Sequence, residues 1–315
     1  MNPPPLLVSF SDIEQYLGAL PSDLVDQFGP EIRRLTTNQL PPVVSALCLA
    51  VLFGISSRFV GAMAHTSSRY YRHFEIPKGH GKRRIQAPRV ALKVIQKWLG
   101  YHLAEAIEYA PCVYGFVKGR SAVQAAALHC GAEWVFSTDI KDFFQNTTVS
   151  MIRDPLQSLG YSENGAALIV ALCCYGQGLA QGSPASPVLS NLAFRSVDLQ
   201  LLQIAEQSHL RYTRYADDIV FSGLGIFPEE LPSDVRRIIE SHGWMIADHK
   251  EALSLSPKRL KVHGLLVNGQ KPRLTKGYRN RIRAYKHLMS VGRIAPEDLP
   301  KVKGHLAYAA SVERV

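Results

Sequence analysis

Two adjacent aspartates, Asp217 and Asp218, lie between two short runs that favour β-strands, 210–213 and 219–222. Neighbouring carboxylates raise the cost of ionising each other, and a cation between them makes that repulsion tolerable. A third aspartate, Asp139, follows the run WVFST at 134–138, which predicts a buried strand. Two strand ends of one sheet would bring the three carboxylates together. Such a cluster suits two Mg²⁺ ions, or Mn²⁺ as a substitute, in phosphoryl transfer. The alternative for each aspartate is a turn-forming role.

The remaining sequence predicts the elements that would position these aspartates. Helices are expected within 11–65 and at 91–107, 148–160, 163–175, 187–206 and 228–241, with a helical C-terminal stretch. Two β-prone runs, 70–77 and 82–88, flank the sequence KGHG and predict a hairpin with a flexible basic tip. Short strands are expected at 252–255 and 261–267. Hairpins, an antiparallel sheet and flanking helices indicate an α+β fold rather than a doubly wound sheet.

Composition and hydropathy narrow the class of protein. The 315 residues, 46% of them hydrophobic, can form a sizeable core. Five cysteines show neither a CxxC pair nor metal-ligand spacing, which is typical of reduced thiols. The longest apolar stretch, 43–55, covers 13 positions, fewer than the roughly 20 that span a bilayer. We therefore expect a buried helix at 43–55. We also expect a cytoplasmic protein without a membrane partner.

Positive charge is concentrated in two regions of the sequence. The net charge is +10, and residues 257–315 contain 14 Lys and Arg against 3 Asp and Glu. In the second region, 69–97, Glu75 is the one acidic residue among nine basic ones: Arg69, Arg72, Lys78, Lys82, Arg83, Arg84, Arg89, Lys93 and Lys97. Two basic surfaces around an acidic centre suggest that the chain holds a polyanion, although two solvated faces explain charge alone equally well.

The clearest amphipathic segment is KGYRNRIRAYKHLM, residues 276–289. Its basic residues recur at helical spacing on one face: Lys276, Arg279, Arg283 and Lys286. An apolar stripe lies on another face: Tyr278, Ile282, Tyr285 and Met289. One face is expected to pack and the other to follow a phosphate backbone.

Three motifs resemble those of reverse transcriptases, in the order that the family has them. RYADD at 214–218 resembles the tyrosine-x-aspartate-aspartate motif, DIKDFF at 139–144 the first catalytic-aspartate motif, and QGSPASP at 181–187 the motif between them. The resemblance implies an α+β right-hand polymerase with fingers, a palm (antiparallel sheet plus helices) and a short helical thumb. The implied parts are an N-terminal helical region (1–68), fingers (69–130), palm (131–256, with finger elements interleaved at 148–180), and primer grip with basic thumb (257–315).

Residue by residue, the resemblance makes Asp139, Asp217 and Asp218 catalytic metal ligands. Phe144 matches the aromatic gate that excludes a ribose 2′-hydroxyl, with a core aromatic as the alternative. The other residues implied to line the dNTP site are Arg83, Arg84, Asp142, Phe143, Gln181, Gly182 and Lys250. One of the two arginines would hold the triphosphate, for which guanidinium geometry is suited. Lys250 matches a proton donor to pyrophosphate, and a solvated lysine is the alternative.

Within that family, EIPKGHGKRRIQAPRVALKVIQKWL at 75–99 and GFVKGRSA at 115–122 resemble bacterial retron reverse transcriptases most closely. Two retron signatures depart from the usual pattern: Asn-Ala-x-x-His is AAALH at 125–129, and Val-Thr-Gly is Val262-His263-Gly264. Both are tied to recognition of the cognate RNA, so the departures bear on RNA specificity. The implied nucleic-acid contacts are His129, Val262, His263, Gly264, Lys276, Arg279, Arg283 and Lys286. For His129, the alternative is a buried, hydrogen-bonded histidine.

The implied function is an RNA-directed DNA polymerase that uses dNTPs and Mg²⁺ to extend a 2′-hydroxyl of its own structured non-coding RNA. The product would be a short single-stranded DNA (msDNA) joined to RNA, in antiphage defence with a separate effector protein. Two other functions stay open. One is another bacterial reverse transcriptase, of the group II intron-like or abortive-infection type. The other is a non-catalytic nucleic-acid-binding scaffold that partners a toxin, against which the intact aspartate set argues.

Overall fold

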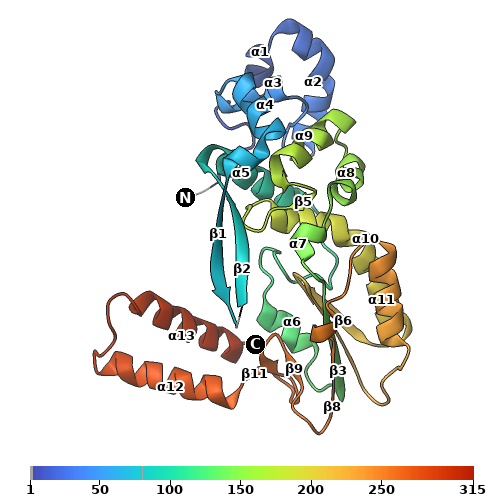
Figure 1. Ribbon diagram of the computed structural model, residues 1–315, viewed down its shortest axis with the longest axis vertical. Coiled ribbons are helices and arrows are strands. Elements are labelled where there is room, and N and C mark those ends of the chain that lie inside the picture. Colours follow the sequence, from blue (N-terminus) through green and yellow to red (C-terminus); the bar gives the residue numbers. More distant parts are fainter. Residues whose placement is uncertain (1–2, 80) are drawn as a thin grey trace. The chain divides into compact units, whose positions relative to one another are not determined.

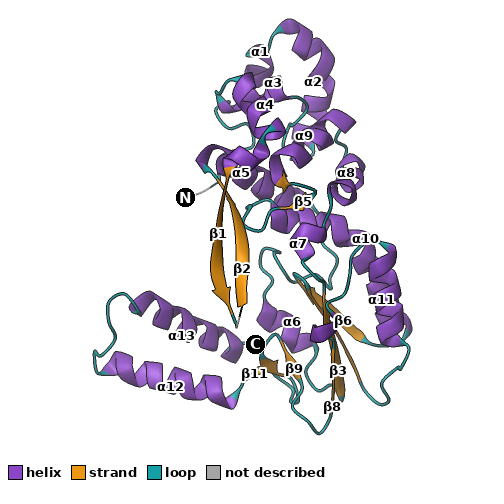
Figure 2. Cartoon of the chain, viewed as in Figure 1, coloured by secondary structure: helices purple, strands orange, loops and turns teal. Residues whose placement is uncertain are grey.

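The computed structural model describes residues 3–79 and 81–315, which form two compact units. Unit 1 consists of Met1–Tyr109 and Asp142–Arg195, and unit 2 of Ala110–Lys141 and Ser196–Val315. Figures 1 and 2 show their helices and strands. Because the chain passes between the units after residues 109, 141 and 195, each unit contains segments from distant parts of the sequence. The predicted boundaries of fingers, palm and thumb stay a prediction.

Unit 1 combines a helical N-terminal region with a long β-hairpin. The first helices are α1 (Ile13–Gly18), α2 (Ser22–Thr37), α3 (Ala46–Phe53) and α4 (Ser57–His65), followed by the short η1 (Ser67–Tyr70). Serine side chains cap α3 and α4 at Ser45 and Ser56, as the N-cap preference predicts. The hairpin pairs β1 (Tyr71–Lys78) with β2 (Gly81–Pro88), and α5 (Val90–Ala106) follows. The predicted flexible tip includes His80, which lies outside the described residues.

The rest of unit 1 comes from the middle of the chain. It contains α7 (Phe143–Asn146), α8 (Val149–Ser158) and α9 (Glu163–Cys173), then the paired strands β4 (Cys174–Tyr175) and β5 (Gly178–Leu179). The long helix α10 (Ser186–Gln207) begins in unit 1 and ends in unit 2. These elements confirm the helices predicted at 148–160, 163–175 and 187–206.

Unit 2 is built on a four-stranded antiparallel sheet in the order β6-β7-β3-β8. The strands are β3 (Trp134–Asp139), β6 (Arg211–Tyr215), β7 (Asp218–Gly223) and β8 (Ala252–Leu255), accompanied by α6 (Ala122–Leu128), α11 (Leu231–Ser241) and the short η2 (Asp248–Lys250). A smaller sheet contains β9 (Lys261–Val262), β10 (Leu265–Leu266) and β11 (Arg273–Leu274). Helices α12 (Lys276–Ser290) and α13 (Leu299–Glu313) complete the unit. The predicted α+β class with an antiparallel sheet is confirmed.

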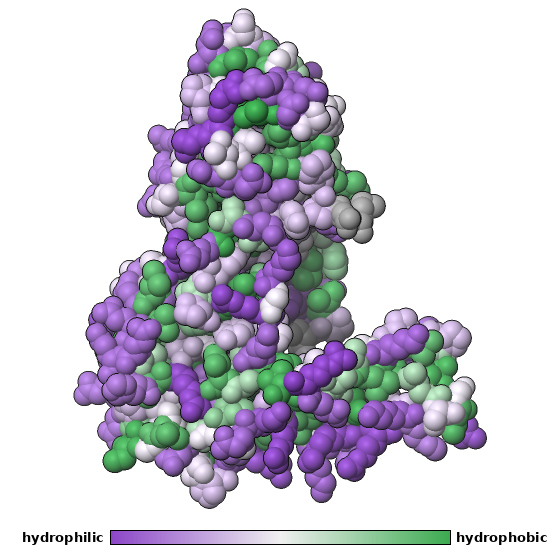
Figure 3. Space-filling view, turned by 180° about the vertical axis from the view of Figure 1, so that it is seen from behind, coloured by the Kyte–Doolittle hydropathy of each residue, from purple (hydrophilic) through white to green (hydrophobic). Residues whose placement is uncertain are grey.

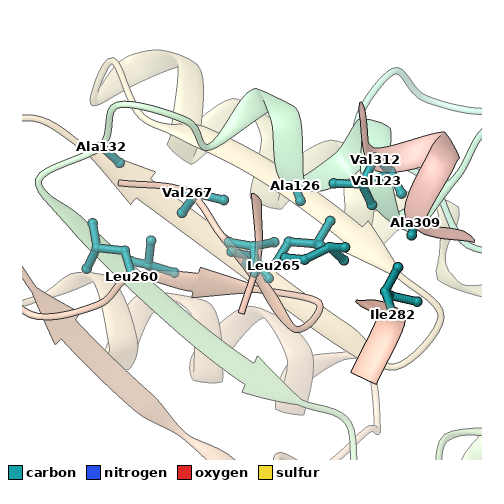
Figure 4. Close-up of a cluster of buried hydrophobic side chains, with 13 residues drawn as sticks. Val123, Ala126, Ala132, Leu260, Leu265, Val267, Ile282, Ala309 and Val312 are labelled. Atoms are coloured by element: carbon teal, nitrogen blue, oxygen red, sulfur yellow. The ribbon is translucent and has the colours of Figure 1, made fainter. Parts of the chain in front are cut away.

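One apolar cluster joins the C-terminal helices to the two sheets of unit 2 (Figure 4). It includes Val135 and Val220 from the large sheet, Leu265 from the small sheet, Ile282 from α12 and Val312 from α13. Tyr278 and Tyr285 pack against it, as the amphipathic pattern predicts, whereas Met289 is 41% exposed because α12 continues beyond the cluster. Burial of this stripe fixes which face of α12 is presented to solvent.

Two further expectations concern local structure. The strand predicted at 261–267 is interrupted, because His263 and Gly264 have positive φ angles of 48° and 80° and form a tight turn between β9 and β10. Over the described residues, no helix has the length and apolar character needed to cross a membrane. The apolar run at 43–55 instead contains α3, in which Cys48, Leu49, Ala50 and Leu52 are buried.

Candidate active site

The three predicted catalytic aspartates lie at one edge of the large sheet of unit 2. Asp139 ends β3 and Asp218 begins β7, and the two residues are direct cross-strand partners. Asp217 belongs to the two-residue turn that joins β6 to β7, and its carbonyl accepts a hydrogen bond of 3.1 Å from the Ile140 backbone N–H. The local hairpin and the pairing of β3 with β7 therefore bring the three residues together, as the sequence predicts.

Burial and neighbouring charge shift the pKa values of Asp139 and Asp218 in opposite directions. Burial, reinforced by the negative charge of Asp217, raises the pKa of Asp139 to about 6 even though Lys250 opposes the rise. Burial also tends to raise the pKa of Asp218, but hydrogen bonding with His263 and Asp139 and the charge of Lys250 bring it below its ordinary value. The cluster thus carries concentrated negative charge that a cation would relieve.

The ammonium group of Lys250 offsets part of this negative charge. Its Nζ lies 2.5 Å from Asp139 Oδ1, so the two side chains form a close ion pair. The segment before it runs beside the end of β3: the Ala247 N–H donates to Asp139 O at 2.8 Å, and the Lys141 N–H donates to Met245 O at 2.8 Å. The predicted dNTP-site lysine therefore contacts one of the predicted catalytic aspartates directly.

The turn between β9 and β10 also reaches the aspartates. His263 Nδ1 lies 3.7 Å from Asp218 Oδ2, and the His263 ring packs against Tyr215 with centroids 5.3 Å apart. The His263 side chain is only 6% exposed, whereas Gly264 at the tip is exposed. Val262 is buried in the apolar cluster, so its side chain is not exposed for the predicted contact with nucleic acid.

Unit 1 contains a second group of predicted site residues. The Gln86 N–H of β2 donates to Gln181 O at 2.8 Å, and the Gln181 N–H donates to Gln86 Oε1 at 2.9 Å. A Cβ at Gly182, whose φ is +131°, would lie 2.9 Å from Gln86 O, so this position requires glycine. Arg83 and Arg84 precede Gln86 on the same strand and, being adjacent, point to opposite faces of the hairpin.

The predicted gate residue lies on the short helix α7 of the same unit. Phe143 is buried, with its ring edge against Phe194 at a centroid distance of 5.6 Å, and it stacks on the partly exposed Phe144 at 5.9 Å. Gln145 Nε2 donates a long hydrogen bond of 3.5 Å to Gln181 Oε1. The structure therefore joins α7 to the Gln181 motif within unit 1. Asp142, just before α7, is exposed with a positive φ of 45°.

His129 is enclosed rather than presented to a ligand. It is 0% exposed, and its Nδ1 and Nε2 each lie 2.7 Å from a hydroxyl oxygen, of Ser222 and Thr213 respectively. Burial, with added repulsion from His263 and Arg211, lowers its pKa to about 3. The structure favours the buried, hydrogen-bonded alternative for this residue, because its ring has no open side for RNA.

The basic face of α12 remains in solvent. The four predicted phosphate contacts are all exposed: Lys276, Arg279, Arg283 and Lys286. Seen from behind in Figure 3, hydrophilic side chains line one edge of the α12–α13 pair. This face carries no acidic residue between Lys276 and Ser290, so it offers an uninterrupted positive surface.

A metal site requires several donor side chains that converge on one point. Over residues 3–79 and 81–315, no three Asp, Glu, His or Cys side chains converge as a ready-made metal cage. Carboxylate oxygens are nevertheless the ligands that Mg²⁺ and Mn²⁺ prefer. The Lys250 ammonium already lies against Asp139, so a positive charge is accommodated at this position. The residues therefore fit divalent cations by chemistry and charge.

Gly115 contacts the turn that contains Ala216 and Asp217, a role that the sequence alone did not predict. A Cβ on Gly115 would lie 2.1 Å from the Ala216 backbone nitrogen, and the preceding Tyr114 N–H donates to Arg214 O at 2.8 Å. No local pattern around Gly115 signals this requirement, because the atom that excludes a side chain comes from a turn that is distant in the sequence.

Comparison with known proteins gives consistent matches. The family model described as reverse transcriptase (RNA-dependent DNA polymerase) matches residues 76–281. The retron Ec86 reverse transcriptase of Escherichia coli is 29% identical over 82% of this chain and 82% of its own length. The retron Mx65 reverse transcriptase of Myxococcus xanthus is 29% identical over 89% of this chain and 71% of its own. A telomerase structure from Candida albicans has a TM-score of 0.47 and 11% identity, over 70% of this chain and 50% of that one. The predicted resemblance to retron reverse transcriptases is confirmed.

Proposed function

Because this chain belongs to the reverse transcriptase family of RNA-directed DNA polymerases, we propose that it is a retron-type enzyme that makes msDNA. It would copy its own structured non-coding RNA, starting from an RNA 2′-hydroxyl. The observation that carries this proposal is similarity to retron enzymes along most of the chain. The cross-strand Asp139–Asp218 pair supports it, since both aspartates match catalytic positions of the motifs.

Reverse transcriptases generally use divalent cations, and two Mg²⁺ ions, or Mn²⁺ in their place, would be held by Asp139, Asp217 and Asp218. When bound, such ions lower the pKa of an attacking hydroxyl and stabilise the leaving oxygen. Lys250 is paired with Asp139 in this structure. It would be released once the negative charge of Asp139 is neutralised by another cation. Its ammonium group could then donate a proton to the departing pyrophosphate.

The residues of unit 1 would select and orient the dNTP. The Phe144 ring would exclude a 2′-hydroxyl by shape, while the Gln181–Gly182 backbone, pinned to β2 by paired hydrogen bonds, would line the nucleotide pocket. One guanidinium of the adjacent Arg83 and Arg84 would hold the triphosphate. As part of the same proposal, the enzyme acts in the cytoplasm, in antiphage defence with a separate effector.

The test is expression of the chain with its native flanking DNA, followed by purification and nuclease digestion. We expect a short single-stranded DNA to co-purify. A branched ribonucleotide should survive ribonuclease on that DNA and yield to an enzyme that cleaves 2′,5′ linkages. The Asp217→Asn variant, prepared identically, is the matched control and should carry RNA without DNA. A linear, 3′-extended product would contradict the retron type while leaving polymerase activity in place.

A further inference from the structure

A buried ion pair lies directly beneath the aspartate turn of unit 2. Arg214 on β6 is 0% exposed, and Asp198 on α10 is 1% exposed. Arg214 Nε donates to Asp198 Oδ1 at 2.7 Å and Nη2 donates to Oδ2 at 2.6 Å, a bidentate geometry. The Tyr212 hydroxyl also donates to Asp198 Oδ1 at 2.8 Å. The carboxylate is therefore held by two side chains of β6 that are two residues apart, on the same face of the strand.

Arg214 has a further hydrogen bond, to the turn itself. Its Nη1 donates to Ala216 O at 3.0 Å, and this carbonyl belongs to the peptide bond that joins Ala216 to Asp217. Ala216 has a positive φ of 58°, a conformation that costs energy for a residue other than glycine. Something must hold this peptide plane, because relaxation at Ala216 would rotate it and redirect the Asp217 side chain.

The backbone of Arg214 is also secured. Its N–H donates to Cys112 O at 2.8 Å, and its carbonyl accepts from the Tyr114 N–H at 2.8 Å. The guanidinium therefore extends from a fixed strand position, with its orientation set by Asp198. A lysine could not reproduce this arrangement, because it lacks the planar fork that binds a carboxylate with two parallel donors while a third donor points elsewhere.

We infer that Arg214 and Asp198 form a positioning pair, which holds the Ala216–Asp217 peptide so that the Asp217 carboxylate faces the catalytic centre. A buried ion pair adds little net stability compared with apolar side chains of similar volume, so the contribution of this pair is geometric. The inference rests on the proposed function, in which Asp217 acts at the polymerase centre. Neither residue touches substrate in this scheme; both act through the turn.

The experiment replaces the polar side chains of Tyr212, Arg214 and Asp198 by apolar ones. It thereby distinguishes an effect on the position of Asp217 from an effect on the stability of the fold. The triple variant Tyr212→Phe, Arg214→Met and Asp198→Leu removes both charges and the tyrosine hydroxyl together, so no charged side chain of the pair is left buried without its partner. We expect its melting temperature to stay near that of the wild type. Its kcat for dNTP incorporation on primed RNA should fall roughly 10- to 100-fold, as for a small misplacement of a reacting group. The KM for dNTP should change far less, because the dNTP contacts of unit 1 are untouched.

Two further variants keep the inference testable if the triple variant is unstable. Arg214→Lys retains the charge beside Asp198 and should fold, but it should lose kcat. Ile239→Ala, a core truncation in α11, lowers stability without touching the network and should keep kcat below its melting temperature. Activity that follows stability alone across these variants, or a stable triple variant with wild-type kcat, would overturn the positioning role. A wild-type chain without DNA synthesis would instead overturn the proposed function.

Discussion

At the residue scale, the proposed catalysis depends on the negative charge of Asp139 and Asp217. Replacing either residue by asparagine keeps the shape and removes the charge that divalent cations require. We expect Asp139→Asn and Asp217→Asn to lose DNA synthesis to below about one hundredth of the wild-type rate, a barrier increase of roughly 2.7 kcal/mol or more. Binding of labelled RNA, measured in parallel, should be nearly unchanged. Substantial DNA synthesis by either variant would show that the replaced carboxylate does not bind a catalytic metal ion.

Phe144 tests the selection of the sugar. Its ring is partly exposed beside the buried Phe143, so its truncation opens space without emptying the core. We expect Phe144→Ala to incorporate GTP much more readily relative to dGTP, because selectivity based on a steric clash is lost when the clash is removed. Phe144→Tyr, which keeps the ring, is the control and should retain discrimination. A ratio within about twofold of wild type, worth well under 1 kcal/mol, would place the gate elsewhere.

At the element scale, His129 links the end of α6 to the central strands β6 and β7 through Thr213 and Ser222. Its pKa is lowered to about 3 by burial first, then by His263 and Arg211. An unfolded chain therefore binds this proton near pH 6.5 while the folded chain does not, so the stability that the neutral ring contributes is lost as pH falls from about 6.5 towards 3.

This linkage predicts that the free energy of unfolding falls by up to about 1.4 kcal/mol per pH unit below pH 6.5 on account of His129. In denaturant titrations at pH 7, 6 and 5, His129→Gln should be less stable at pH 7 but should show a flatter dependence on pH. His287→Gln, at an exposed position of α12, should keep the wild-type slope. Parallel curves for wild type and His129→Gln would show that this histidine is not the titrating group.

Helix α12 is the element expected to follow a phosphate backbone, since Ile282 is buried and the basic face is exposed. Changing Arg279 and Arg283 together to alanine should weaken RNA binding. It should also reduce the slope of log K against log salt by about 1.4 to 1.8, because each phosphate contact contributes roughly 0.7 to 0.9. The matched control is Arg236→Ala with Arg237→Ala on α11, whose side chains are paired with acidic residues. Equal slopes for all three proteins would make α12 a solvated face.

At the scale of the whole molecule, the proposed metal site would link cation binding to folding. A divalent cation that binds only the folded chain stabilises it by about 2.7 kcal/mol at a concentration 100 times its Kd. We therefore expect Mn²⁺ to raise the melting temperature of the wild type measured without any substrate. It should have little effect on the Asp139→Asn and Asp217→Asn variants. A rise of equal size in all three would locate the stabilising ion away from the aspartates.

Short segments of the sequence determine the type of many helices and strands in this protein. Helical periodicity in 91–107, alternating runs around the hairpin of residues 71–88 and the positions of Asp139, Asp217 and Asp218 at a strand end and a turn are all properties of short segments. The element types follow from them, because backbone preference and side-chain spacing act over a few residues. The same is true of α12, whose buried and exposed faces follow its amphipathic pattern as far as Tyr285.

Tertiary structure alone decided which of these elements meet. Lys250 contacts Asp139 because the segment at 245–247 runs beside the end of β3, and His129 is buried because α6 packs on the sheet. Arg214 shows the physical reason most clearly. Three consecutive residues of β6, Tyr212, Thr213 and Arg214, are buried, so both faces of the strand are covered and no alternation of polar and apolar residues distinguishes them. A charged residue can occupy such a position only if a partner is supplied from elsewhere, and Asp198 comes from a different element, α10, through packing that no local pattern specifies.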